Sequence, residues 1–298
     1  MGTTYYYKVR SVASSKTYTG AFSTAVPCLC VCGRPSVKVS VNSTYGKPYL
    51  SWGAVSGAQS YVIYRMDAQG NEIQLAEITA TSYRDDAAAP DTDYSYKVNA
   101  LGADAALHSA DGSYQLVHAT VAQPAVTAKS DAATGKPVLT WDAVDGAVSY
   151  KVYRATKKSG TYKAVATVTD PTYTDTAASR GKTYYYKVRA YGANCSSVYS
   201  SIKSCASRNA QPVVTVTAGS TGNPVLTWGK VSGTKKYEVY RSTSPDSGFT
   251  RVKSTTSLKF TDSAPAEGIT YYYKVRSVAS SSSYTGAYSQ VAVFPLPQ

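Results

Sequence analysis

Hydrophobic and polar residues alternate in short segments along the chain. One stretch contains Val138-Leu-Thr-Trp141, Tyr150-Lys-Val-Tyr-Arg154, Lys163-Ala-Val-Ala-Thr-Val168 and the segment 184–189, with Gly, Asp and Ser clusters between them. A period of two residues predicts half-buried strands, and the clusters predict turns. No segment combines a helical period with helix caps. The chain is therefore predicted to be all-β.

A domain-sized repeat underlies this pattern. Trp52, Trp141 and Trp228 recur at separations of 89 and 87 residues. A second motif occurs four times, as Tyr5-Tyr-Tyr-Lys-Val9, Tyr94-Ser-Tyr-Lys-Val98, Tyr184-Tyr-Tyr-Lys-Val188 and Tyr271-Tyr-Tyr-Lys-Val275. Residues 1–26 match residues 270–295 almost one for one. We therefore expect the chain to open inside a truncated repeat.

Three prolines set the expected domain boundaries, because Pro35, Pro124 and Pro212 each open a Val-rich alternating segment. About seven short strands per repeat, with frequent turn signals, predict an antiparallel β-sandwich. Linkers between the repeats are nearly absent. The predicted division is a truncated repeat (its last two strands) with a Cys-rich linker in 1–34, and full domains in 35–122, 123–210 and 211–298.

The whole chain resembles the fibronectin type III module. The matching features are the single Trp in the second predicted strand of each repeat, a Tyr-x-Val strand at Tyr61, Tyr150 and Tyr237, and the motif Pro90-Asp-Thr-Asp-Tyr94-Ser-Tyr-Lys-Val98. The resemblance implies tandem seven-stranded antiparallel immunoglobulin-like β-sandwiches. The later repeats have glycine at the position of Asp91, which implies a different loop in the same fold.

The resemblance also implies residue roles and a location. Tyr94, Tyr184 and Tyr271 would each form a tyrosine corner, in which the tyrosine hydroxyl is hydrogen-bonded to a backbone group just upstream. Compact repeats with these tyrosine motifs look like tandem arrays in bacterial secreted or surface proteins, so we expect an extracellular or cell-surface location. The structural residues are Trp52, Trp141, Trp228, Tyr94, Tyr184 and Tyr271.

Alternation sorts each strand into two faces, and the outer face is the candidate ligand-facing surface. Flat rings that stack on sugars, with cations that neutralise acidic groups, would form a binding platform. The same residues would also stabilise a sheet by roughly 0.2 to 1 kcal/mol per cross-strand pair without any ligand. The first repeat has Ser95 and Asn99 at outer positions. The candidates in the later repeats are Tyr153, Tyr185, Lys187, Arg189, Tyr240, Tyr272, Lys274 and Arg276.

The formal net charge of +13 is unevenly distributed. It is +4 in residues 1–34, −4 in the first full domain, +8 in the second and +5 in the third. An acidic domain beside basic ones favours homotypic association or adhesion to anionic cell-wall polymers. Nucleic acid is not expected as a partner, because no recognition motif occurs. No apolar run is long enough for a membrane span, and the first residues lack the pattern of a signal peptide.

Residues for catalysis are scarce. The chain has two His residues, and we find no nucleophile, phosphate-loop or metal motif of known spacing. We predict no enzyme activity, no cofactor and no metal. The weighed alternatives are zinc at Cys28-x-Cys30-x-Cys32 and calcium at Asp85-Asp86 with Asp91 and Asp93, or at Asp170 with Asp175. The five thiols are expected to be mostly reduced, with linker disulfides as the alternative.

Repetition with minimal linkers predicts a non-catalytic spacer or interaction array of a secreted or surface protein, which positions other domains of a longer chain. One alternative is a module that binds carbohydrate or a cell-wall polymer through the outer Tyr, Lys and Arg side chains. A second is a self-assembling surface or filament subunit in which residues 1–26 complete a sheet in another chain.

Overall fold

The computed structural model describes residues 2–14, 19–67, 69–266 and 268–294. They form two compact units, one of residues 1–123 with 192–198, the other of residues 124–191 with 199–298. All paired strands are antiparallel, and the only helices in the described residues are the one-turn segments η2 (Ala105–Leu107) and η3 (Ser282–Tyr284). None of them has the length or apolar character for crossing a membrane. The predicted all-β fold class is confirmed.

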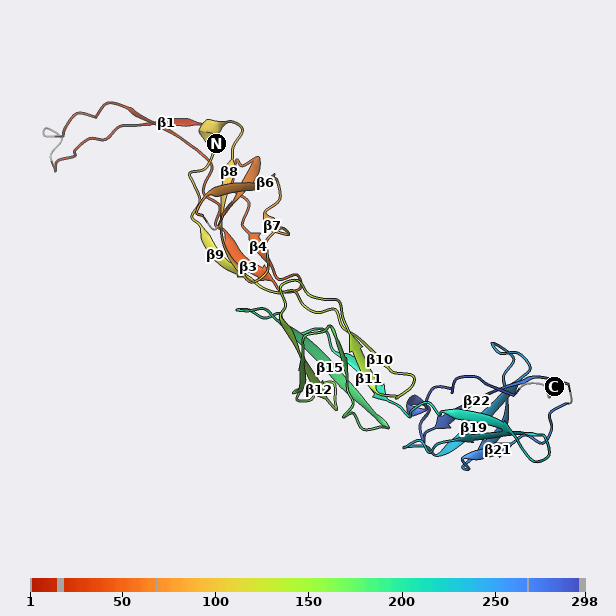
Figure 1. Ribbon diagram of the computed structural model, residues 1–298. Coiled ribbons are helices and arrows are strands. Elements are labelled where there is room, and N and C mark those ends of the chain that lie inside the picture. Colours follow the sequence, from red (N-terminus) through yellow and green to blue (C-terminus); the bar gives the residue numbers. More distant parts are fainter. Residues whose placement is uncertain (1, 15–18, 68, 267, 295–298) are drawn as a thin grey trace. The chain divides into compact units, whose positions relative to one another are not determined.

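The first unit contains one full sandwich (Figure 1). Its three-stranded sheet has the order β3 (Lys38–Asn42), β4 (Lys47–Ser51), β7 (Ser82–Arg84). Its four-stranded sheet has the order β6 (Glu72–Ile78), β5 (Ser60–Met66), β8 (Thr92–Leu101), β9 (Gln115–Ala119). Leu50 from the first sheet packs with Ile63 and Val98 from the second, and all three are fully buried.

A two-stranded ribbon of β1 (Thr4–Tyr7) and β2 (Val26–Leu29) also belongs to the first unit. Tyr5 and Tyr7 are 51% and 58% exposed there, whereas the matching Tyr271 and Tyr273 are 6% and 0% exposed. In the described residues no second sheet covers the ribbon. The same sequence is therefore core in one repeat and surface in another. The strand-exchange hypothesis for this segment stays a prediction.

The second unit contains two more sandwiches of the same topology. The second sandwich pairs β10 (Thr127–Ser130), β11 (Pro137–Thr140) and β14 (Thr172–Thr174), and in its other sheet β13 (Lys163–Val168), β12 (Ser149–Ala155), β15 (Lys182–Tyr191) and β16 (Lys203–Ser207). The third pairs β17 (Val214–Ala218), β18 (Pro224–Trp228) and β21 (Lys259–Thr261), and then β20 (Thr250–Thr255), β19 (Lys236–Ser242), β22 (Tyr271–Val278) and β23 (Ala292–Phe294). The exact domain boundaries stay a prediction from the repeat.

A ring contact between Trp and Tyr recurs in every sandwich core, edge-on in the first two and tilted in the third. The ring centroids of Trp141 and Tyr150 are 5.3 Å apart at 65°, and the other two pairs have separations of 5.4 and 5.5 Å. The Tyr150 hydroxyl accepts a hydrogen bond of 2.8 Å from the backbone N–H of Val144. The equivalent bonds in the other sandwiches have the same length. Each core thus fixes the turn before its second sheet through one tyrosine.

A tyrosine near the start of β8, β15 and β22 fixes a second turn. The hydroxyl of Tyr184 accepts a hydrogen bond of 3.1 Å from the N–H of Ser179, five residues upstream. Tyr94 and Tyr271 make the same contact at 2.9 and 3.0 Å. This is the geometry of a tyrosine corner.

A buried aspartate connects the two sheets of each sandwich. Asp175 follows β14, is fully buried, and accepts hydrogen bonds from Arg154 of β12 at 2.7 Å and Tyr186 of β15 at 2.8 Å. The first and third sandwiches repeat this triad with similar distances. The triads are Arg65–Asp85–Tyr96, Arg154–Asp175–Tyr186 and Arg241–Asp262–Tyr273. Asp85 and Asp175, considered above for calcium, therefore hold arginine instead.

Candidate binding face

The outer face of the second sandwich collects aromatic rings around two cations. Tyr184, Tyr186, Val188 and Ala190 of β15 are buried, so Lys187 and Arg189, which alternate with them, point outward. The Lys187 ammonium lies 3.6 Å from the ring centroid of Tyr199, and it is also near two more tyrosines. We call this surface the cation–tyrosine face, formed by Tyr153, Tyr162, Lys187, Arg189, Tyr191 and Tyr199.

The rings of this face also contact one another. Tyr153 and Tyr199 meet edge to face with centroids 5.2 Å apart, and the Tyr153 and Tyr191 hydroxyls are 3.3 Å apart. Burial, followed by these hydroxyl contacts, raises the pKa of Tyr153. Each cation over a ring contributes on the order of 0.5–1 kcal/mol at an exposed site. Many of the rings and cations of this face therefore already contact one another within the sandwich.

The third sandwich adds a buried carboxylate to the same arrangement. Arg276 lies 5.5 and 5.0 Å from the ring centroids of Tyr240 and Tyr288. Its guanidinium donates two hydrogen bonds, of 2.9 and 2.7 Å, to Glu238, which is 4% exposed. Burial alone would raise the pKa of Glu238, but the hydrogen bonds from Arg276 and Tyr240 outweigh it and lower the value to about 2.

The lowered pKa of Glu238 predicts that the third sandwich loses stability at acidic pH. Because the folded-state pKa of Glu238 lies below its ordinary value, its contribution is present at neutral pH and is lost as the pH falls from about 5 to about 2. The expected loss is about 2 to 3 kcal/mol. Hydrogen exchange of β19 and β22 peptides along a pH series measures it, after correction for the pH dependence of intrinsic exchange. Glu238→Gln should remove this component, and an unchanged acid response in that variant would contradict it.

In the first sandwich, a carboxylate neutralises the lysine that is equivalent to Lys187. Lys97 lies 5.0 and 5.4 Å from the rings of Tyr64 and Tyr114, and it forms an ion pair of 2.5 Å with Glu72. In the described residues no ion pair between Lys187 and a carboxylate is found. The second sandwich thus presents its lysine to rings alone, which agrees with its higher net charge.

Two predicted residues lie apart from these clusters. Tyr185 and Tyr272 point outward and are half-buried, and no ring or cation stacks on them in the described part of the chain. The cross-strand neighbours of Tyr185 are Ala155 and Ser204. Those of Tyr272 are Ser242 and Val293. Of the predicted set, the structure gathers Tyr153 with Lys187 and Arg189, and Tyr240 with Arg276, whereas Lys274 stacks on Phe249.

Several members of these clusters were not predicted from the sequence. Tyr199 and Tyr288 follow β15 and β22 and lie outside the strands where the alternation was analysed. Their signal was the recurrent Tyr-Ser ending of the repeats. Glu238 was missed because it stands at an outer strand position, which the pattern alone assigns to solvent.

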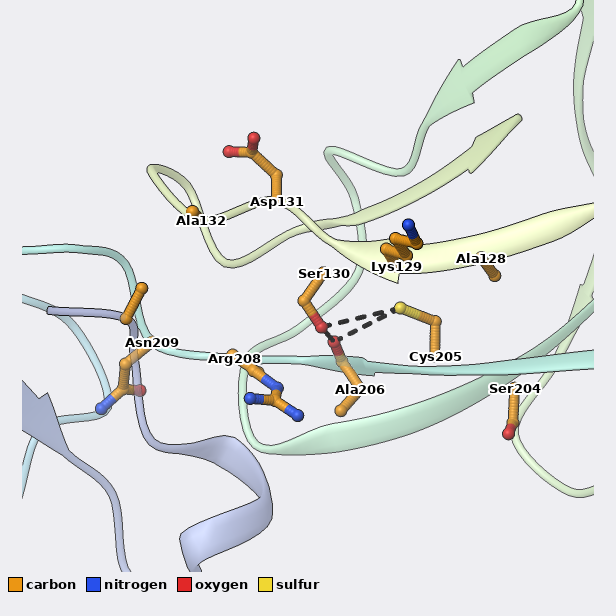
Figure 2. Close-up of a pocket in the computed structure, with 11 residues that line it drawn as sticks. Ala128, Lys129, Ser130, Asp131, Ala132, Ser204, Cys205, Ala206, Arg208 and Asn209 are labelled. Carbon is orange, nitrogen blue, oxygen red and sulfur yellow. Dashed lines mark hydrogen bonds between the residues drawn. The ribbon is translucent and has the colours of Figure 1, made fainter.

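A groove of the second unit contains the buried thiol Cys205 (Figure 2). Its sulfur is 3.7 Å from the Ser130 hydroxyl, and that hydroxyl donates to the Ala206 carbonyl at 2.7 Å. Burial raises the pKa of the Cys205 thiol, so it stays protonated at neutral pH and is a poor nucleophile. All five cysteines, each of them within the described residues, are free thiols.

Known proteins resemble the chain over parts of their length. No protein-family profile matches it. Amylopullulanase of Thermoanaerobacter thermohydrosulfuricus is 46% identical over 72 residues, 24% of this chain and 5% of that protein. Exoglucanase B of Cellulomonas fimi is 28% identical over 278 residues, 82% of this chain and 24% of that protein. The chain thus spans at most about a quarter of these relatives.

Two solved structures with detectable similarity are named for fibronectin-type domains. The FN1–FN3 domains of chicken CNTN1 are 16% identical and cover 90% of this chain and 99% of that one, with a TM-score of 0.31. An Fn3-like protein from Clostridium thermocellum is 37% identical over 28% of this chain and 88% of that one, with a TM-score of 0.26.

The topology itself identifies the module. Each full sandwich has a three-stranded and a four-stranded antiparallel sheet, a core tryptophan, and a tyrosine whose hydroxyl binds backbone five residues upstream. These are features of the immunoglobulin-like sandwiches that include fibronectin type III domains. The described residues therefore form a tandem array of sandwiches with the immunoglobulin-like fold of fibronectin type III domains.

Proposed function

We propose that the chain is a non-catalytic spacer array within a longer extracellular protein that acts on polysaccharides. The observation behind this proposal is that one sandwich repeats through the chain and aligns with 278 residues of exoglucanase B, which is only 24% of that protein. Both relatives are named as enzymes that act on glucose polymers. By analogy, the array holds other domains of its own chain at a distance from one another.

The outer faces support a spacer more than a ligand site. Arg276 is hydrogen-bonded to Glu238, Lys97 is paired with Glu72, and Lys187 lies on Tyr199. A ligand would have to replace these contacts, whereas a spacer uses them to keep its sheets rigid.

Carbohydrate binding is the second candidate, and Tyr185 and Tyr272 favour it. Both rings lie on the outer face beside small cross-strand neighbours, which are Ala155 and Ser204 for Tyr185 and Ser242 for Tyr272. A ring of this kind can stack on a sugar face.

A retention experiment separates the two functions. The full chain is passed over insoluble glucans and anionic polysaccharides at low and high salt. The spacer proposal predicts no retention, or retention that high salt abolishes because it arises from net charge. Salt-resistant retention on one polymer, lost in the Tyr185→Ala/Tyr272→Ala variant but kept in Tyr45→Ala, would overturn the spacer and establish a binding face. Tyr45 is a suitable control because it is 51% exposed on the first sandwich.

A further inference from the structure

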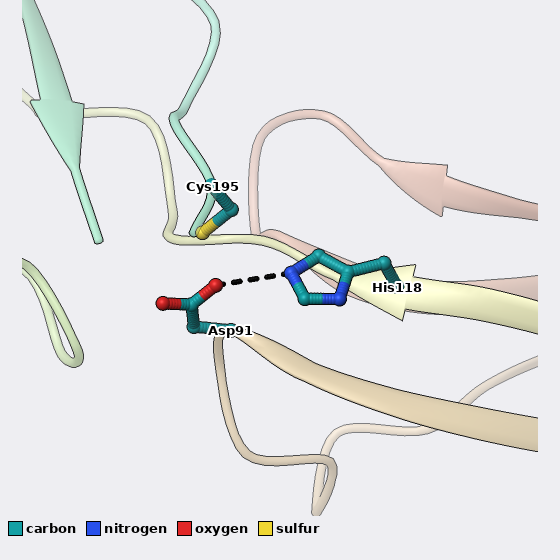
Figure 3. Close-up of side chains that lie close together, drawn as sticks. All are labelled: Asp91, His118 and Cys195. Carbon is teal, nitrogen blue, oxygen red and sulfur yellow. Dashed lines mark hydrogen bonds and ion pairs between the residues drawn. The ribbon is translucent and has the colours of Figure 1, made fainter. Parts of the chain in front are cut away.

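Three chemically different metal-ligand side chains converge in the first compact unit (Figure 3). Asp91 precedes β8, His118 lies on β9, and Cys195 lies in the segment 192–198, which belongs to the same unit. One ligand atom from each residue lies within 4.8 Å of the other two. Asp91 Oδ1 and His118 Nε2 are 3.0 Å apart.

Neighbouring groups hold these side chains in place. Asp93 accepts a hydrogen bond of 2.8 Å from His118 Nδ1, which directs Nε2 towards Asp91. A carboxylate on the far nitrogen is the usual support of a metal-binding histidine. The backbone N–H of Asn194 donates to the other oxygen of Asp91 at 2.8 Å.

The backbone around the cluster leaves room for these groups. A Cβ on Gly192 would lie 2.9 Å from the Cys195 sulfur and 3.0 Å from a carboxylate oxygen of Asp91. Asp91 itself has φ of +54°, and it is the only described non-glycine residue with positive φ. The other full repeats have Gly181 and Gly268 in this turn, with φ of +72° and +77°. The first repeat therefore has an aspartate at a position of positive φ, a backbone conformation that costs glycine less than any other residue.

The geometry points to a site for Zn²⁺ or a similar borderline-soft cation, bound by Asp91, His118 and Cys195. A tetrahedral zinc ion with these donors needs ligand atoms about 3.3 to 3.6 Å apart. The Asp91–His118 separation of 3.0 Å is slightly shorter, and all three ligand atoms lie within 4.8 Å of one another, so small side-chain adjustments would bring them to this spacing. On binding, the Cys195 thiol and the His118 Nε2–H that contacts Asp91 each release a proton to solvent, and thiolate and carboxylate together balance the 2+ charge. The fourth position is left to water. Calcium does not suit the set, because it takes six to eight oxygen ligands.

Cobalt substitution tests this site on the full chain. The experiment uses a Cys28→Ser/Cys30→Ser background, since those two thiols lie outside the sandwich cores and could bind metal themselves. We expect one Co²⁺ per chain, a thiolate-to-cobalt charge-transfer band, visible bands of tetrahedral intensity, and displacement by one equivalent of Zn²⁺. Cys195→Ser should remove the charge-transfer band, and His118→Gln should weaken Co²⁺ binding by at least about tenfold.

Two further variants separate ligand loss from misfolding. Asp91→Gly installs the residue of the other repeats at a positive φ, so the fold should be kept while affinity falls at least about tenfold. Asp93→Asn, which alters a positioning residue, should weaken binding about 10- to 100-fold but leave the charge-transfer band. His108→Gln is the matched control and should change nothing. Absence of a stoichiometric band, or a band that survives Cys195→Ser, would overturn the site.

Discussion

Replacement of Asp85 by alanine is expected to destabilise the first sandwich by about 3 to 5 kcal/mol. The Asp85 side chain is 1% exposed and accepts hydrogen bonds of 2.7 Å from both Arg65 and the Tyr96 hydroxyl. Its removal leaves the guanidinium and the fully buried hydroxyl without their acceptor. Hydrogen exchange of peptides from β5 and β8, which contain the two donors, measures the loss.

The adjacent residue provides the matched control. Asp86 is 66% exposed and forms an ion pair with Arg84 at the surface. Exposed pairs contribute roughly 0 to 1 kcal/mol, so Asp86→Ala should scarcely change the exchange of the same peptides. Equal effects of the two substitutions would contradict the role assigned to the buried triad.

The triads show which buried polar residues the hydrophobic–polar alternation could predict and which it could not. Arg154 has the same parity as Tyr150 and Val152, so it lies on their inner face, where an arginine requires a partner. Each triad arginine is followed by its aspartate after 20 or 21 residues, in all three repeats. From the sequence, Asp85 and Asp175 were considered only as possible calcium ligands, and Asp262 was not singled out. Their true position depends on β14 and its equivalents, which place the carboxylate opposite a strand of the other sheet.

Strand pattern and core were predictable because burial repeats along each strand. In β15 the buried residues are Tyr184, Tyr186, Val188 and Ala190, in strict alternation. Contacts made by connecting segments could not be derived in this way. The loop 192–198 lies in the second repeat by sequence period, yet it is part of the first compact unit. Cys195 therefore has Asp91 and His118 as neighbours, which no spacing along one repeat indicates.

Replacement of Trp141 by alanine is expected to destabilise the second sandwich by about 3 to 5 kcal/mol. The indole is 6% exposed and packs edge-on against Tyr150, so its removal leaves a cavity between the two sheets. Hydrogen exchange of β12 and β15 peptides measures the effect without depending on tryptophan fluorescence. In the described residues the indole N–H of Trp141 has no hydrogen-bond partner. Trp141→Phe keeps an aromatic ring in the core and should cost clearly less than alanine, and an equal cost of the two substitutions would contradict the assignment of the loss to packing.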